Sequence, residues 1–196
     1  AACTAGEQGR TGELLGHDPQ VALRIRVPAF SSLAPPAAYQ PPLSLVPASP
    51  APQPQQMAEA AAEEQGLSNV RFEVESATSY QGSYDLICFF DCMHDMGDPV
   101  GIAEHAKSQL GENGSVMLIE PFAFDSRQEN HAGLGGAFYG FSSFFCTPCS
   151  LSQEVGRGMG AQAGEPGMRA VFDEAGYGNF QRISETPTNI VYEAFA

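Results

Sequence analysis

The sequence predicts an α/β protein in which short buried strands alternate with helices. Residues 84–90 form an apolar run without helical spacing, as is typical of a parallel strand covered on both faces. An amphipathic helix pattern follows at residues 99–110, with apolar side chains repeating on one face. A second apolar run at residues 115–120 is ended by Pro121. Strand, helix and strand in this order favour the α/β class.

The loop between the first strand and the helix is the candidate functional site. Residues 91–98 hold three carboxylates and one imidazole, and Asp98 is placed to cap a helix that begins at Pro99. Ligands of open α/β sheets bind just beyond the carboxyl ends of the strands. The sequence therefore predicts chemistry in this loop.

Two segments of different character divide the chain, at residues 1–56 and 57–196. Residues 19–56 hold ten of the fifteen prolines. Proline fixes φ and removes a hydrogen-bond donor, so we expect no helix or central strand there, and a Pro/Gly-rich, largely disordered or irregular segment. Residues 21–27 are the exception, because they alternate like a half-exposed strand that could pair at a sheet edge.

The second segment contains further predicted elements. The Ala- and Glu-rich residues from Met57 predict a helix that Gly66 ends. Residues 70–74 alternate as a strand, and the glycines at 111 and 114 predict a turn between the helix and the run at 115–120. A helix is predicted at 166–175, followed by a hairpin of residues 180–184 and 189–195.

Charge and composition exclude several kinds of partner. The net charge is −14, and residues 57–196 carry six basic and twenty acidic side chains, which argues against binding nucleic acid or anionic membranes. No apolar run has the length of a membrane span, and residues 1–15 lack signal-peptide features. An odd number of cysteines, five, favours reduced thiols. We expect a cytoplasmic protein.

Residues 84–98, the following helix, Gly111-Glu112-Asn113-Gly114 and residues 115–121 resemble the fourth and fifth strands of a class I S-adenosylmethionine-dependent methyltransferase. The similarity is to the small-molecule O-methyltransferase branch, in which a His-Asp pair follows the fourth strand. The resemblance covers residues 57–196. It implies an incomplete Rossmann-like methyltransferase sheet with a C-terminal antiparallel hairpin, S-adenosylmethionine as the cofactor, and a small-molecule methyl acceptor.

The resemblance also implies roles for single residues. His94 would be the base that removes the acceptor proton, and Asp95, or Asp91 from across the loop, would orient its imidazole. Met96 departs from the family pattern, in which tryptophan usually follows this pair. The implied cofactor-binding residues lie near the adenine and near the methionine part: Glu75, Ser76 and Ala77, then Phe89, Phe90 and Asp91.

The aromatic and glycine-rich stretch from Phe122 to Cys149 is expected to be buried, over the cofactor cleft or against a partner. In the resembling family, the insert after the fifth strand helps to shape the substrate pocket, which implies Phe138, Tyr139 and Phe141 as walls of the pocket or of a lid, with core packing as the alternative. The Cys146-x-x-Cys149 pair supplies only two metal ligands, and His131 is too isolated to complete a site, so no metal is predicted.

The first strands of the resembling family have no counterpart before Met57. Their glycine-rich loop, D/E-x-G-x-G-x-G, wraps the cofactor, and its absence makes activity doubtful. Without those strands the edges of the remaining ones would be unpaired. The sequence leaves three interpretations open: a working enzyme with an improvised cofactor site, a degenerate domain, or a non-catalytic module that binds a protein partner or a second copy at its exposed strand edges.

Overall fold

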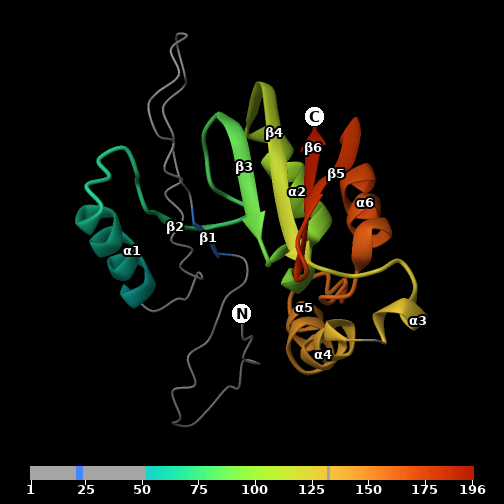
Figure 1. The fold of residues 1–196 in the computed structure, drawn as a ribbon. Helices are drawn as coiled ribbons and strands as arrows, with labels where there is room; N and C mark the ends of the chain where they lie inside the picture. The colour runs from blue at the N-terminus through green and yellow to red at the C-terminus, as the bar shows by residue number, and fades with distance from the viewer. Residues whose placement is uncertain (1–20, 24–51, 132) are drawn as a thin grey trace.

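The computed structural model describes residues 21–23, 52–131 and 133–196 (Figure 1). Its main sheet has four strands in the order β3 (Tyr84–Phe90), β4 (Leu110–Pro121), β6 (Asn189–Phe195) and β5 (Asn179–Glu185). β3 and β4 are parallel, whereas β4–β6 and β6–β5 are antiparallel. This arrangement confirms the predicted α/β class with a C-terminal hairpin.

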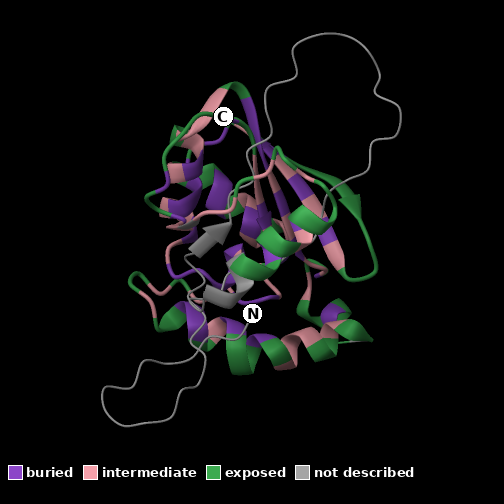
Figure 2. Ribbon diagram, turned by 90° about the vertical axis from the view of Figure 1, so that its left-hand side faces the viewer, coloured by how far each residue is buried: buried purple, intermediate pink, exposed green. Residues whose placement is uncertain are grey.

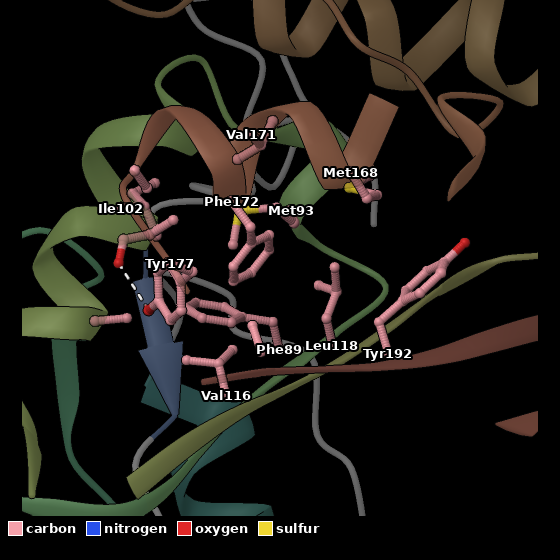
Figure 3. Close-up of a cluster of buried hydrophobic side chains, with 14 of the residues drawn as sticks. Phe89, Met93, Ile102, Val116, Leu118, Met168, Val171, Phe172, Tyr177 and Tyr192 are labelled. Carbon is pink, nitrogen blue, oxygen red and sulfur yellow. Dashed lines mark hydrogen bonds between the residues drawn. The ribbon is translucent and has the colours of Figure 1, made fainter. Parts of the chain in front are cut away.

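Two helices pack on one face of this sheet, α2 (Pro99–Ser108) and α6 (Gly164–Glu174). Every second residue of β4 faces them, so Val116 and Leu118 are buried. The cap predicted for α2 is present, because the Asp98 side chain accepts a hydrogen bond from the Gly101 amide at 2.9 Å. Figure 3 shows the resulting core, in which strand residues point toward both helices.

An aromatic cluster closes the C-terminal part of the core. Phe172 of α6 lies 4.9 Å from Tyr177 and 5.1 Å from Phe180, measured between ring centroids. Phe180 stacks on Tyr192 of β6 at 5.0 Å. The Tyr177 hydroxyl donates a hydrogen bond to the Ala103 carbonyl at 3.0 Å, drawn as a dashed line in Figure 3. The four aromatic residues, all buried, are called the C-terminal aromatic cluster.

A second, two-stranded sheet pairs β1 (Val21–Leu23) with β2 (Val74–Ser76) in antiparallel orientation. The pairing confirms the predicted strand for residues 21–23, and its continuation lies outside the described residues. The strand predicted at 70–74 was wrong in position, since β2 shares only Val74 with it. Pairing with β1, in which Val21 is opposite Ser76, fixes the strand further along the chain.

Helix α1 (Pro52–Glu64) begins inside the proline-rich segment, against our expectation that no helix would enter it. Pro52 and Pro54 occupy its first turn. The amides of the first turn have no partner within a helix, so proline loses no hydrogen bond there.

Strand β4 also begins earlier than predicted, because the glycines at 111 and 114 lie within the strand and do not form a separate turn. The β3–β4 ladder is irregular here: Tyr84 pairs with Leu110, and the next pair is Leu86 with Ser115. A Cβ on Gly114 would lie 2.6 Å from the Tyr84 carbonyl oxygen. Glycine is required at this position for the close approach of the two backbones.

The expectation that β3 is covered on both faces was wrong. Leu86 is 47% exposed and Asp85 is exposed as well, whereas Phe89 is buried against the helices. Among the described residues β3 is an edge strand of its sheet. The sheet is therefore well covered on the α2 and α6 face and less so on the other.

Four short helical pieces follow β4: α3 (Arg127–Asn130), α4 (Leu134–Phe141), a π-helix (Ser142–Cys146) and α5 (Thr147–Leu151). We call residues 134–151 the exposed aromatic segment. The predicted burial was wrong for α4, which has no buried residue. Figure 2 shows exposed and half-buried residues along most of this segment, at the bottom of the molecule. Its exposed large apolar residues are Leu134, Phe141, Phe144, Phe145 and Leu151.

Candidate active site

The predicted loop leaves the sheet directly after β3. The Asp91 amide still bonds the Ile119 carbonyl of β4 at 2.8 Å, and Asp91 then adopts a φ of 46° that turns the chain out of the ladder. Aspartate is one of the few non-glycine residues that tolerate this region. Its carboxylate accepts a hydrogen bond from the Asn189 side chain of β6 at 2.8 Å. A 3₁₀ turn, η1 (Met93–Asp95), follows and is buried.

His94 is held by a glutamate that the sequence analysis did not assign. Glu120, at the end of β4, accepts a hydrogen bond from the Met93 amide at 2.9 Å, and its second oxygen lies 2.5 Å from His94 Nδ1. Both side chains are buried. The available signal was an ionisable residue two positions after Leu118, on the face where β4 residues alternate into the core.

Asp95 approaches the other side of the imidazole ring. Its Oδ1 lies 3.3 Å from His94 Nε2, and the two side chains are almost fully enclosed, with residue exposures of 4% for His94 and 2% for Asp95. Asp95 Oδ1 has no hydrogen-bond partner among the described residues. The thiol of Cys146 completes the group, since the ligand atoms of His94, Asp95 and Cys146 all lie within 4.8 Å of one another.

These neighbours decide the charge of His94. Burial by itself lowers the pKa of His94, but the Glu120 carboxylate, the Cys146 side chain and Asp95 together raise this pKa well above its usual value. The net direction follows from the short contact with a buried carboxylate. These neighbours therefore favour the protonated, charged form of His94.

The segment after the π-helix holds η1 in place. Ser150 Oγ donates to the Met96 carbonyl at 2.7 Å, and Gln153 Nε2 donates to the Asp95 carbonyl at 2.8 Å. The Gly160 amide bonds the His94 carbonyl at 3.2 Å. A Cβ on Gly160 would lie 2.2 Å from Ser142 Oγ, and φ is +71°, so this close approach requires glycine.

The predicted cofactor residues occupy different environments. Glu75 and Ser76 are half-buried in β2, and Ala77 is fully buried in the main core. Among the residues at the end of β3, Phe89 packs into the core, Phe90 is half-buried and Asp91 is exposed. The side chains of Phe89 and Ala77 thus face the interior, which leaves their backbones to contact a cofactor. The assigned roles stay predictions.

The predicted acceptor-pocket residues lie on α4. Phe138 and Tyr139 are half-buried, and Phe141 is 59% exposed. The ring of Tyr139 contacts the ring of His131, at 5.9 Å between centroids. The structure places these residues on one helix without burying any of them, and their role in acceptor binding also stays a prediction.

The cysteines divide by environment. Cys88, Cys92 and Cys146 are free thiols, as expected, whereas Cys149 is disulfide-bonded, against the expectation of reduced thiols. Burial raises the pKa of the Cys88 thiol to about 11. Cys146 faces His94 and not its C-x-x-C partner, so the two cysteines do not act as a pair.

The fold defines a class of protein. The architecture is similar to a candidate O-methyltransferase from Nostoc punctiforme, to the S-adenosylmethionine-dependent methyltransferase SibL, and to an O-methyltransferase family 2 protein from Planctomyces limnophilus solved with apigenin. Identities are 16–20% and TM-scores 0.54–0.55. The alignments cover 72–74% of this chain and 41% of each of those chains. The fold is therefore that of the Rossmann-like class I methyltransferases, whose cofactor is S-adenosylmethionine.

The sequence identifies the family. A profile described as "Methyltransferase domain" matches residues 22–156, which is more than half of the chain, so the protein belongs to this methyltransferase family. The match begins within residues 1–56, ahead of the boundary predicted at residue 57, and that boundary stays a prediction. No curated protein sequence matches the chain. In the described part of the chain, no helix combines the length and apolar character that crossing a membrane requires.

Proposed function

We propose that the protein transfers a methyl group from S-adenosylmethionine to a hydroxyl group of a small molecule, with His94 as the general base. The observation that carries this proposal is the buried His94–Glu120 pair at the carboxyl ends of β3 and β4. Ligands of open α/β sheets bind at this edge. The similarity to a protein solved with apigenin, a small molecule, supports an acceptor of that size.

His94 and Glu120 have different roles in proton removal. Glu120 holds Nδ1 of His94 and stabilises the imidazolium, so Nε2 is the atom that receives the acceptor proton. Asp95 lies 3.3 Å from Nε2 and helps to keep the ring in one orientation. S-adenosylmethionine, when bound, would supply the methyl group from its sulfonium, and His94 would take the proton that the acceptor hydroxyl loses.

The charge of His94 gives the proposal a pH dependence. Only the neutral imidazole can accept a proton, and the pKa of His94 is raised well above its usual value. The transfer rate should therefore rise with pH as His94 loses its proton. A substrate must also reach a ring that is almost fully enclosed, so acceptor binding requires residues around His94 to move.

Cofactor binding is expected to be weak in this chain. The sequence offers no D/E-x-G-x-G-x-G loop, and that part of the chain lies outside the described residues. Isothermal calorimetry with S-adenosylhomocysteine measures the remaining affinity. Binding in the micromolar range would support a functional cofactor site, with residues 75–77 and 89–91 as its proposed contacts. A folded chain without binding would favour a non-catalytic role.

The test of the base is methyl transfer from labelled S-adenosylmethionine to a panel of small phenols and alcohols. His94→Ala should reduce turnover at least tenfold, because general-base catalysis contributes about 100-fold or more. The matched control is His131→Ala, which replaces an exposed histidine on the same chain. Equal turnover by wild type and His94→Ala would contradict the assigned role.

A second candidate function is a non-catalytic module that binds a protein partner or a second copy. The observation that favours it is the exposed aromatic segment, together with the edge position of β3 among the described residues. Sedimentation analysis distinguishes the two. Self-association that Phe144→Ser and Phe145→Ser abolish, in a chain without cofactor binding, would favour the module.

A further inference from the structure

We propose that His94, Asp95 and Cys146 form a site for one Zn²⁺ ion. The side chains come from two places in the chain, His94 and Asp95 from η1 and Cys146 from the end of the π-helix, and all three are buried. Histidine nitrogen, carboxylate oxygen and cysteine thiolate are the ligands that Zn²⁺ takes in proteins. Three protein ligands with one position left open are typical of sites where zinc also binds water or a substrate.

The geometry of two of these ligands fits a tetrahedral ion. Ligand atoms bound to one Zn²⁺ at about 2.0–2.2 Å lie about 3.4 Å apart in a tetrahedron. His94 Nε2 and Asp95 Oδ1 are 3.3 Å apart. The Cys146 sulfur lies within 4.8 Å of one ring nitrogen of His94 and one carboxylate oxygen of Asp95. A sulfur in the same tetrahedron lies about 3.6 Å from each of the other ligand atoms, so binding requires Cys146 to move inward by about 1.2 Å at most.

Asp95 supplies a second observation. Its Oδ1 is buried and accepts no hydrogen bond from the described residues, although it forms the ion-pair contact with His94 Nε2 at 3.3 Å. A buried carboxylate oxygen without a hydrogen bond is costly, and such groups are rare. A cation between Oδ1 and Nε2 would satisfy both atoms.

Glu120 contacts the ring nitrogen of His94 that would not bind the metal. Metal-binding histidines usually donate their other ring N–H to a carboxylate, which fixes the tautomer and orients the ring. His94 Nδ1 contacts Glu120 at 2.5 Å, so Nε2 is left as the atom for the metal. Cys146 gives its thiol proton to solvent when it binds as thiolate.

The π-helix places the cysteine. It spans Ser142–Cys146, and Ser142 Oγ accepts a hydrogen bond from the Ala161 amide at 3.0 Å. Single π-turns occur frequently at functional sites. Here the widened turn ends on the residue that faces His94.

The metal site and the base use the same nitrogen. A Zn²⁺ ion on Nε2 removes the lone pair that accepts a proton, so the metal-loaded chain should transfer no methyl group. The inference goes beyond the proposed function and does not depend on it, because metal binding needs neither cofactor nor acceptor.

The test titrates the full 196-residue chain, freed of metal with a chelator, with Co²⁺ as a spectroscopic substitute for Zn²⁺. We expect one Co²⁺ per chain, thiolate-to-cobalt absorption in the near ultraviolet, and displacement by Zn²⁺. Cys146→Ser should remove the thiolate absorption, and Asp95→Asn should weaken binding at least tenfold. Glu120→Gln should weaken it about 10–100-fold through the ring of His94.

The matched control is Cys88→Ser, which removes another free thiol and should leave the spectrum unchanged. Circular dichroism confirms that each variant is folded. If a variant does not fold, the spectrum of the unsubstituted chain decides. Absence of thiolate absorption in the folded wild type, or its survival in Cys146→Ser, would overturn the proposal. A chain that binds Co²⁺ as expected but transfers no methyl group in its metal-free form would refute only the proposed enzymatic function.

Discussion

The C-terminal aromatic cluster and the exposed aromatic segment have similar composition and opposite environments. In the cluster, rings from α6, β5 and β6 pack within about 5 Å of one another and are buried. In the segment, Phe144 is 80% exposed and Phe141 is 59% exposed. The cluster has a sheet to pack on, whereas the described residues provide no comparable surface for α4. Aromatic content alone therefore does not predict burial. Burial also requires a neighbouring helix or strand against which the rings can pack.

The largest expected effect lies in the cluster. Phe172→Ala removes a fully buried ring that contacts two other rings, and should lower the free energy of unfolding by about 3–5 kcal/mol. Urea denaturation followed by circular dichroism measures it. The control, Phe144→Ala, should change this free energy by less than about 0.5 kcal/mol. Equal losses of unfolding free energy in Phe172→Ala and Phe144→Ala would contradict the proposed difference between the two regions.

A smaller loss of stability is expected from a substitution at the C-terminal end of the exposed aromatic segment, which contacts the active site. Ser150 is fully buried, donates to the Met96 carbonyl and accepts from the Gly158 amide at 3.0 Å. Ser150→Ala leaves both groups without this partner and should cost about 1–3 kcal/mol. Ser143→Ala is the control, because Ser143 is exposed and bonds the Tyr139 carbonyl one turn earlier. A loss of similar size in both would mean that the segment does not hold η1.

The site between the two regions should make stability depend on pH. The pKa of His94 is higher in the folded protein than in the unfolded chain, where it is about 6.5. The contribution of His94 to the free energy of unfolding is therefore fully present below the unfolded pKa and is lost as the pH rises through the folded pKa. Urea denaturation of the metal-free chain across this range measures it. His94→Gln should flatten that part of the curve. A wild-type stability that rises with pH through this range would contradict the assignment.

The smallest effect on stability is expected at the surface of the segment. Phe144→Ser should leave the free energy of unfolding within about 0.5 kcal/mol and increase solubility, since it removes an exposed apolar ring. Light scattering against protein concentration measures the change. A marked loss of stability would show that Phe144 is covered in solution.

Local signals predicted the fold where neighbouring residues determine it. The cap at Asp98, helix α2 and the β5–β6 hairpin follow from short patterns, and each is present. The start of β4 and the position of β2 were wrong, because pairing with β3 and β1 overrides their turn and alternation signals. Such pairings join residues far apart in the chain and leave no local mark.

The candidate site was predicted only in part for the same reason. His94 and Asp95 stand out as ionisable residues after a buried strand. Glu120 lies 26 residues further along and Cys146 lies in another helix, so only the folded chain brings them to the imidazole. Their chemistry was visible in the sequence, and their proximity was not.

The π-helix has a consequence for how this site can change over generations. A π-turn takes up one residue more than an α-turn, so deleting one residue from Ser142–Cys146 would restore regular winding and change the direction in which the end of this turn points. Cys146 would then swing away from His94 with every side chain of the site intact. The contact between Cys146 and His94 thus depends on the number of residues in this turn as well as on their types, and the loss of a single codon would remove it.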